Sequence, residues 1–237
     1  IAGVYSVTVN DENSCSLTDV VTITEPSAVS VGLTGQTNVS CNGGNDGSAT
    51  VLGSNGTGAI TYLWSNGGQT TATATGLNAG IHFVTATDVN GCTASTNVTI
   101  FQPTAITATI ASLSNVSCNG GTDGQITASG SGGTGINYTF LWSDGQTTAT
   151  ATALSFVASP YTVTVTDINS CTATTTVSIT EPSILVLNAA VSSNYNGEEI
   201  SCNGACDGAV TANANGGTGT FTYQWDAAAS NQSNPTA

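Results

Sequence analysis

The chain has 237 residues, among them 14 Asp or Glu, one His and no Lys or Arg, so its formal net charge is −14. Without cations it has no group to neutralise phosphates, which argues against nucleic acid and against an anionic membrane surface as partners. The negative charge instead favours cations. No apolar run reaches the roughly 18 residues of a membrane span, so no membrane insertion is predicted for this segment.

One strand-and-turn motif recurs three times along the chain. An alternating segment ends in Asp-x-Asn-x-Cys, in the copies Tyr5–Cys15, His82–Cys92 and Tyr161–Cys171. The final cysteines are 77 and 79 residues apart. A fixed period of this size indicates a tandem array in which one structural unit is stacked along an axis.

Three further landmarks set the boundaries of the repeats. The first is a Ser-Cys-Asn-Gly turn that begins at Ser40, Ser117 and Ser201. The second is a Trp, at Trp64, Trp142 and Trp225, and the third is a Pro, at Pro26, Pro103 and Pro182. We therefore divide the chain into residues 1–26 (the C-terminal part of a repeat), 27–103 and 104–182 (two complete repeats) and 183–237 (the N-terminal part of a repeat). The first and last segments are called the N-terminal and C-terminal half-repeats below.

Within one complete repeat the pattern is that of short strands separated by Gly and Asn. For residues 27–103 we predict strands near 28–39, 47–53, 59–65, 70–76, 81–88 and 93–101. Alternation is clear in Val98–Phe101 and Tyr161–Val165, where every second residue can face a core. With no helical periodicity and one Trp per repeat, the sequence predicts an all-β tandem array of immunoglobulin-like β-sandwich repeats of about 79 residues.

The two half-repeats together are about as long as one repeat. We expect the chain to be a three-period segment of a longer array. The alternative is a subunit whose missing strands come from its neighbour, head to tail.

The recurring motifs resemble the SprB-type repeat. They are Ser-Cys-Asn-Gly-Gly-Asn-Asp-Gly-Ser-Ala from Ser40, Tyr-Leu-Trp-Ser-Asn-Gly from Tyr62, Gln-Thr-Thr-Ala-Thr-Ala-Thr-Gly-Leu-Asn-Ala-Gly from Gln69 and Val-Asn-Gly-Cys-Thr-Ala from Val89. The resemblance covers the whole chain. It implies a very long cell-surface adhesin of Bacteroidota, exported by type IX secretion and associated with gliding motility. Two departures are His82, where the other copies have Tyr, and Cys206, where they have Asn or Thr.

Seven cysteines in an acidic chain of surface type predict disulfides. In an immunoglobulin-like repeat the Ser-Cys-Asn turn and the Asp-x-Asn-x-Cys turn lie at opposite ends. Strands of six residues separate those ends by roughly 20 Å, and a disulfide needs Cα atoms within about 7 Å, so Cys41–Cys92 within one repeat is disfavoured. Opposite ends meet where repeats abut, which favours an inter-repeat bond, Cys41–Cys171. The remaining cysteines expected to form disulfides are Cys15, Cys92, Cys118, Cys202 and Cys206, with Cys202–Cys206 as a local alternative.

The acidic and amide side chains gather at the same turns and at the linkers. Oxygen-only sets of this kind suit Ca²⁺, which takes six to eight oxygen ligands, so calcium is predicted as a cofactor at the repeat junctions. The candidate ligands are Asp46, Asp167, Asn169 and Gln102 at one junction, Asp123 and Glu181 at another, and Asp88, Asn90 and Glu25 at a third. The competing interpretation is that Asp-Gly and Asp-x-Asn only form turns, because these side chains hydrogen-bond their own backbone.

Trp and His are two further residue types that can bind a ligand or take part in catalysis. The Trp of each repeat is predicted to be a core residue, with a sugar-stacking platform as the alternative. His82 is predicted to replace the corner Tyr of immunoglobulin-like folds, whose side chain ties back to the backbone. One His without Lys or Arg supplies neither a nucleophile–base pair nor a metal triad, so no catalytic residue and no enzyme is predicted.

The predicted function is therefore that of a non-enzymatic structural repeat region in an extracellular, cell-surface adhesin or filament. Adjacent repeats or subunits are its expected partners, and disulfides and calcium its expected sources of rigidity. A carbohydrate-binding surface module and a head-to-tail polymerising fibre subunit with strand exchange are the alternatives.

Overall fold

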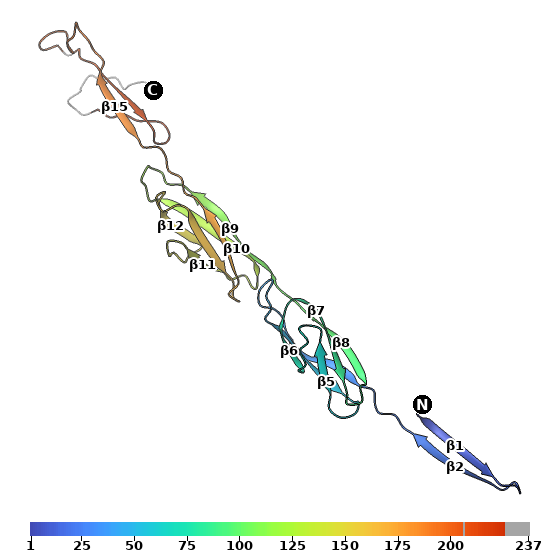
Figure 1. Ribbon diagram of the computed structural model, residues 1–237. Helices are drawn as coiled ribbons and strands as arrows, with labels where there is room; N and C mark the ends of the chain where they lie inside the picture. The colour runs from blue at the N-terminus through green and yellow to red at the C-terminus, as the bar shows by residue number, and fades with distance from the viewer. Residues whose placement is uncertain (206, 226–237) are drawn as a thin grey trace. The chain divides into compact units, whose positions relative to one another are not determined.

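The computed structural model describes residues 1–205 and 207–225, and every regular element in these ranges is a β-strand (Figure 1). The strands are β1 (Gly3–Asn10) and β2 (Ser16–Ile23); β3 (Ser30–Thr37), β4 (Gly47–Ser54), β5 (Thr61–Trp64), β6 (Thr73–Leu77), β7 (Gly80–Thr87) and β8 (Thr93–Ile100); β9 (Thr104–Ser114), β10 (Gly124–Gly133), β11 (Thr139–Trp142), β12 (Thr150–Leu154), β13 (Tyr161–Thr166) and β14 (Thr172–Val177); and β15 (Val186–Val191) and β16 (Val210–Asn215). None of the described residues forms a helix long and apolar enough to cross a membrane.

Each complete repeat consists of two three-stranded sheets. Residues 27–103 form the sheets β3-β4-β6 and β5-β7-β8, and residues 104–182 form β9-β10-β12 and β11-β13-β14 in the same order. The first, second and fourth strands of the repeat thus share one sheet, and the third, fifth and sixth share the other. They correspond to strands A, B and E and to strands C, F and G of an immunoglobulin domain. This is the immunoglobulin arrangement without its fourth strand. The predicted fold class is confirmed, and all six strands predicted for residues 27–103 are present.

The core of each complete repeat lies between its two sheets. In the first, Trp64, Leu77, Val84 and Ile100 are at most 1% exposed. The second buries the equivalent set, and its members are Trp142, Leu154, Val163 and Ile179. A fully buried side chain of this size contributes about 1.5–3 kcal/mol, so these two clusters provide most of the stability of repeats this small.

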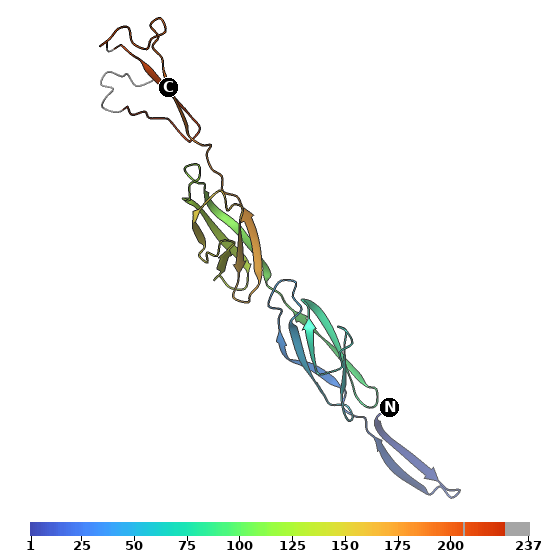
Figure 2. The same cartoon turned by 60° about the vertical axis from the view of Figure 1, so that its left-hand side comes forward.

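The N-terminal half-repeat is a two-stranded hairpin. Strands β1 and β2 pair antiparallel from Gly3 opposite Ile23 to Asn10 opposite Ser16, and they lie side by side in both views (Figures 1 and 2). The hairpin matches β7–β8 and β13–β14, the last two strands of the complete repeats, in sequence and in register.

The C-terminal half-repeat holds the first part of the same fold. Strands β15 and β16 pair antiparallel from Val186 opposite Asn215 to Val191 opposite Val210, as β3 pairs with β4. By internal contacts the chain separates into two compact units, residues 1–105 with 132–134 and residues 106–131 with 135–237. The repeat boundaries given above stay predictions.

Candidate functional site

The Ser-Cys-Asn-Gly turns between the first two strands of each repeat are closed by an aspartate. The Ser40 backbone N–H donates to Asp46 Oδ1 at 3.0 Å, and Ser117 and Ser201 donate in the same way to Asp123 and Asp207. In each turn the serine side chain, followed by its backbone N–H, holds the pKa of that carboxyl below its usual value. The three aspartates are therefore ionised turn formers at neutral pH.

The same turn holds the linker that leaves its own repeat. In residues 27–103, Asn42 Nδ2 donates to the Pro103 carbonyl at 3.0 Å and the Gly43 N–H donates to Gln102 Oε1 at 2.8 Å. Upstream of the turn, Asn38 Oδ1 accepts from the Phe101 N–H at 3.0 Å. We call this set of three hydrogen bonds the linker clamp.

The linker clamp recurs in residues 104–182 with nearly the same distances. Asn119 Nδ2 donates to the Pro182 carbonyl at 3.0 Å, the Gly120 N–H donates to Glu181 Oε2 at 2.9 Å, and Thr180 N–H donates to Asn115 Oδ1 at 2.9 Å. Repetition in two independent copies shows that the sequence encodes the clamp. The clamp asparagines were not among the predicted site residues, although the recurring Asn-Val-Ser-Cys-Asn-Gly run contains them.

The Asp-x-Asn-x-Cys turns at the other end of each repeat are Asx turns. Asp88 Oδ1 accepts from the backbone N–H groups of Asn90 and Cys92, both at 2.9 Å, and Asp167 Oδ1 accepts from Asn169 and Cys171 at the same distances. Asp88 Oδ2 also accepts from the Thr57 N–H, which is the main cause of the lowered pKa of Asp88. Both aspartate residues are buried, with 6% of their surface exposed.

The predicted calcium ligands Asp46, Asp88, Asp123 and Asp167 therefore lie in turns, with backbone donors on their carboxylates. Asp88 and Asn90 lie together in one turn, and Asp167 and Asn169 lie together in another. Glu181 accepts a hydrogen bond from the Gly120 N–H, in the turn that Asp123 closes. Glu25 lies exposed between β2 and β3. Within residues 1–205 and 207–225, no three His, Cys, Asp or Glu side chains gather in a metal-binding group. Calcium stays a prediction.

The cysteines divide into two classes. Cys41 and Cys171 are each disulfide-bonded. Cys15, Cys92, Cys118 and Cys202 are exposed free thiols in this structure, and the expectation that they also form disulfides stays a prediction. Cys206, with its proposed local bond to Cys202, lies outside the described residues.

The tryptophans of the complete repeats are core residues. Trp64 and Trp142 are 1% and 2% exposed, and each indole N–H donates to a backbone carbonyl at 2.9 Å, of Thr71 and Thr148 respectively. A buried ring offers no face to a sugar. The sugar-stacking interpretation of these two residues is therefore wrong.

His82 takes the place of a corner tyrosine. Its Nε2 lies 2.9 Å from the Asn78 carbonyl, while the Tyr161 hydroxyl donates to the Ser155 carbonyl at 3.1 Å and accepts from the Ser155 N–H at 3.0 Å. His82 is 6% exposed. The predicted structural role is confirmed.

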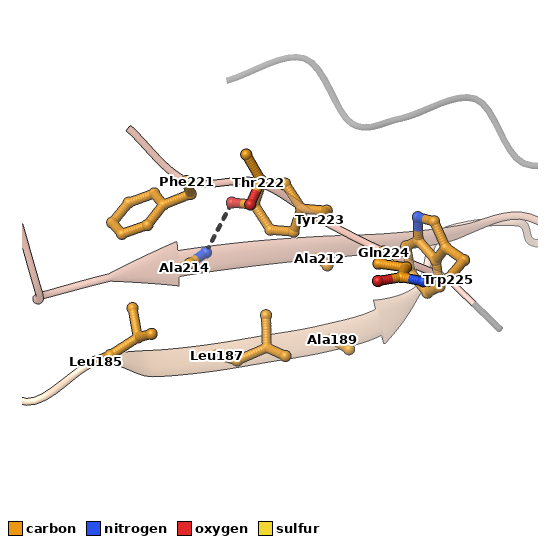
Figure 3. Close-up of a pocket in the computed structure, with 10 residues that line it drawn as sticks. All are labelled: Leu185, Leu187, Ala189, Ala212, Ala214, Phe221, Thr222, Tyr223, Gln224 and Trp225. Carbon is orange, nitrogen blue, oxygen red and sulfur yellow. Dashed lines mark hydrogen bonds between the residues drawn. The ribbon is translucent and has the colours of Figure 1, made fainter. Parts of the chain in front are cut away.

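An apolar groove lies on one face of the C-terminal half-repeat (Figure 3). It is lined by Leu185, Leu187, Ala189, Ala212, Ala214, Phe221, Thr222, Tyr223, Gln224 and Trp225. The Ala214 N–H donates to the Tyr223 hydroxyl at 3.1 Å, the same bond that Gly53 makes to Tyr62 at 2.8 Å in a complete repeat. Residues 222–225 thus occupy the position of β5, and the groove is one half of a sandwich core.

Comparison with known proteins identifies the repeat. The SprB repeat matches the chain three times, over residues 33–69, 110–147 and 194–230. The chain therefore contains three regions that match the SprB repeat, a repeat that belongs to cell-surface proteins and is typically non-enzymatic. No curated protein matches the chain.

Several solved structures are similar to the chain. One contains three N-terminal domains of the highly immunogenic outer capsid protein (Hoc) of bacteriophage RB49, with a TM-score of 0.42, 17% identity and coverage of 70% of this chain and 62% of that one. Another contains immunoglobulin domains 1–5 of Sidekick-1, with a TM-score of 0.30, 12% identity and coverage of 81% and 48%. These similarities are too weak to support an argument, so the fold assignment rests on the strand order described above.

Proposed function

We propose that the chain is a non-enzymatic spacer region of an extracellular, cell-surface adhesin or filament, and that its role is to resist bending and stretching. The observation that carries this proposal is the linker clamp, which recurs in both complete repeats and fixes each outgoing linker to the repeat it leaves. A linker held by three hydrogen bonds has lost the conformational freedom of a flexible tether.

A disulfide between repeats is the second part of the proposal. Cys41 and Cys171 are disulfide-bonded and the other four described cysteines are free, which supports a bond from Cys41 in one repeat to Cys171 in the next. Such a bond limits rotation at the linker. It also implies an oxidising compartment, because structural disulfides persist outside the reducing cytosol. Export by type IX secretion and a role in gliding motility belong to the same proposal.

Small-angle X-ray scattering tests the mechanical role. We expect Cys41→Ser and Cys171→Ser to change the scattering equally, giving a smaller radius of gyration and a broader distance distribution than the oxidised chain. Cys92→Ser is the matched control, because Cys92 is a free thiol. Identical curves for all four proteins would show that the disulfide does not restrict the linker.

A non-reducing peptide map tests the pairing itself. The chain has no Lys or Arg, so cleavage next to acidic and aromatic residues replaces trypsin. We expect one linked peptide that joins Cys41 to Cys171. A peptide joining Cys41 to Cys92 would contradict the proposal.

The thermal midpoint with excess Ca²⁺ and with EDTA tests the predicted junctional calcium. Saturating calcium that binds only the folded state is expected to raise the midpoint by about 10 °C or more, and Asp46→Ala or Asp167→Ala should remove that rise. An unchanged midpoint would leave these aspartates as turn formers, and rigidity would then rest on the linker clamps and the disulfide.

A further inference from the structure

Asn-Gly pairs occur in the loops and turns of the two complete repeats. There are five, and they begin at Asn42, Asn55, Asn66, Asn90 and Asn119. Such a pair deamidates without an enzyme when the backbone nitrogen of the glycine attacks Cγ of the asparagine and ammonia leaves. Glycine has no Cβ to obstruct the attack, and its backbone rotates freely. The surroundings of each pair therefore decide whether it reacts.

The backbone N–H of each glycine is the group that controls the attack. The nitrogen attacks only after it has lost its proton, and a hydrogen bond donated by the N–H stabilises the protonated form. In four of the five pairs the glycine N–H donates such a bond: Gly43 to Gln102 Oε1 at 2.8 Å, Gly120 to Glu181 Oε2 at 2.9 Å, Gly56 to the Ser27 carbonyl at 3.0 Å and Gly91 to the Asp88 carbonyl at 3.1 Å.

The two pairs in the linker clamps are held by a second hydrogen bond. Asn42 Nδ2 and Asn119 Nδ2 each donate to a proline carbonyl at 3.0 Å. Deamidation removes Nδ2 as ammonia and removes the proton from the glycine nitrogen, so both bonds of the clamp are lost during the reaction. Both pairs are nevertheless exposed to solvent. Their exposure alone would make them reactive, whereas their hydrogen bonds make them resistant.

The pair Asn66-Gly67, in the turn between β5 and β6, has neither kind of bond. Within the described part of the chain, no hydrogen bond is made by the Asn66 side chain or by the Gly67 N–H. Gly67 and Gly68 are exposed, with φ of 65° and 67°, and a Cβ on either would meet no atom within 4 Å. The turn therefore has room to bring the nitrogen to the roughly 3–3.5 Å from Cγ that the attack requires.

The next repeat already carries the product of this reaction at the matching turn. Asp144-Gly145 follows Trp-Ser there, as Asn66-Gly67 does in residues 27–103. Asp144 Oδ1 accepts from the Gln146 N–H at 3.1 Å, and its Oδ2 accepts from Gln146 Nε2 at 2.7 Å. A carboxylate at this place is therefore compatible with the fold.

We propose that Asn66 is a site of spontaneous deamidation, and that hydrogen bonds to the glycine N–H preserve the other four pairs of the complete repeats. Hydroxide removes the proton of the Gly67 nitrogen, the new N–Cγ bond closes a succinimide, and the Cγ–Nδ2 bond breaks. Ammonia leaves with a proton from water, which regenerates hydroxide. Water then opens the ring at either carbonyl to aspartate or isoaspartate. One water is consumed and one ammonia released, and the chain gains one negative charge.

Incubation of the folded, oxidised chain at mildly alkaline pH tests the site. Peptides from cleavage at aromatic residues are followed by the mass change of amide to carboxylate, and an isoaspartate-specific methyltransferase labels the second product. We expect Asn66 to convert about tenfold faster than Asn42 or Asn119, whose hydrogen bonds have to be lost first. The same chain unfolded in guanidinium is the reference, and there all five pairs should convert at comparable rates.

The order of the rates decides between hydrogen bonding and exposure as the controlling factor. Asn66 is only half-buried and Asn42 is exposed, so exposure alone predicts that Asn42 reacts first. Conversion of Asn42 at the rate of Asn66 or faster would overturn the proposal. An Asn66 that stays intact in the folded chain while the unfolded reference reacts would overturn it as well.

A variant of the linker clamp tests the role of the hydrogen bonds directly. Gln102→Ala removes the acceptor of the Gly43 N–H and should speed the conversion of Asn42 by about 2- to 10-fold, with Asn66 unchanged. Gln125→Ala is the matched control, because Gln125 is an exposed glutamine of the other complete repeat, and it should leave every rate unchanged. An unaltered Asn42 rate in Gln102→Ala would show that the clamp does not preserve its asparagine.

Two substitutions at the site itself complete the test. Asn66→Gln should abolish the charge gain at this turn, because the longer side chain cannot close a five-membered ring with the Gly67 nitrogen. Asn66→Asp should keep the thermal midpoint of the unaltered chain, as expected from Asp144 in the matching turn. Continued charge gain at this turn in Asn66→Gln, or a lower midpoint in Asn66→Asp, would contradict the proposal.

Discussion

Residues 104–182 and the N-terminal half-repeat contain the same two final strands in opposite circumstances. In the complete repeat, β13–β14 covers a facing sheet, and Val163, Val165 and Ile179 are fully buried. In the half-repeat, β1–β2 has the same register, the same Asx turn and the same apolar pattern, yet it buries almost nothing. Local sequence is therefore sufficient to form the hairpin and its turn, whereas stability comes from the facing sheet.

The largest expected difference between the two regions concerns one isoleucine position. Ile179→Ala should destabilise residues 104–182 by about 2–5 kcal/mol, because it opens a cavity in a packed core. Ile23→Ala should change the stability of dilute, monomeric protein by less than about 0.5 kcal/mol, because its side chain is already half exposed. Hydrogen exchange of peptides from each region measures both changes. Equal effects would mean that the hairpin is covered in the monomer.

The corner tyrosines give the next largest difference. Tyr161→Phe should cost about 1–3 kcal/mol, because both backbone groups of Ser155 lose their hydroxyl partner. Tyr5→Phe removes only an exposed bond to the Ile1 carbonyl and should cost below about 0.5 kcal/mol. Urea unfolding of the two variants against the unaltered chain measures the difference. A comparable loss of stability in Tyr5→Phe would show that the hairpin depends on the hydrogen bond from Tyr5 to the Ile1 carbonyl.

The linker clamp predicts a smaller and more local effect. Asn115→Ala should cost about 0.5–1.5 kcal/mol and should speed hydrogen exchange of the Thr180 amide, whose acceptor is lost. Glu199 holds the equivalent position in the C-terminal half-repeat, and Glu199→Ala is the control, with an expected change below about 0.5 kcal/mol. Amide exchange followed by NMR distinguishes the effects of the two substitutions. An unchanged Thr180 exchange rate would show that the clamp does not hold the linker.

Acid is expected to weaken the turns of the complete repeats only at low pH. The folded-state pKa values of Asp46, Asp88 and Asp123 lie below the ordinary value, so their contribution is present above that value and is lost as the pH falls through the folded-state pKa. The thermal midpoint should therefore be flat from pH 7 to about 5 and should fall below about pH 4. Asp88→Asn should flatten that fall, since it removes a carboxylate that accepts from three backbone N–H groups. A fall that begins near neutral pH would contradict this assignment.

Sequence alone determined the secondary structure and the architecture of this protein. The alternation of β-branched and polar residues defines each strand, and Gly, Asn and Asp define each turn. These signals are local, so they were sufficient to predict all six strands of residues 27–103, the burial of Trp64 and Trp142, and the role of His82. The period of the motifs extended the prediction to the array.

Only the tertiary structure decided which groups meet. Asp46 and Glu181 look alike as oxygen ligands in the sequence, but one closes a turn with Ser40 and the other accepts the Gly120 N–H. Likewise, the six described cysteines lie in turns of similar sequence, yet two of them are disulfide-bonded and four are free thiols. Hydrogen-bond partners more than 60 residues apart, such as Asn115 and Thr180, depend on how the sheets fold back on themselves, and no local pattern carries that information.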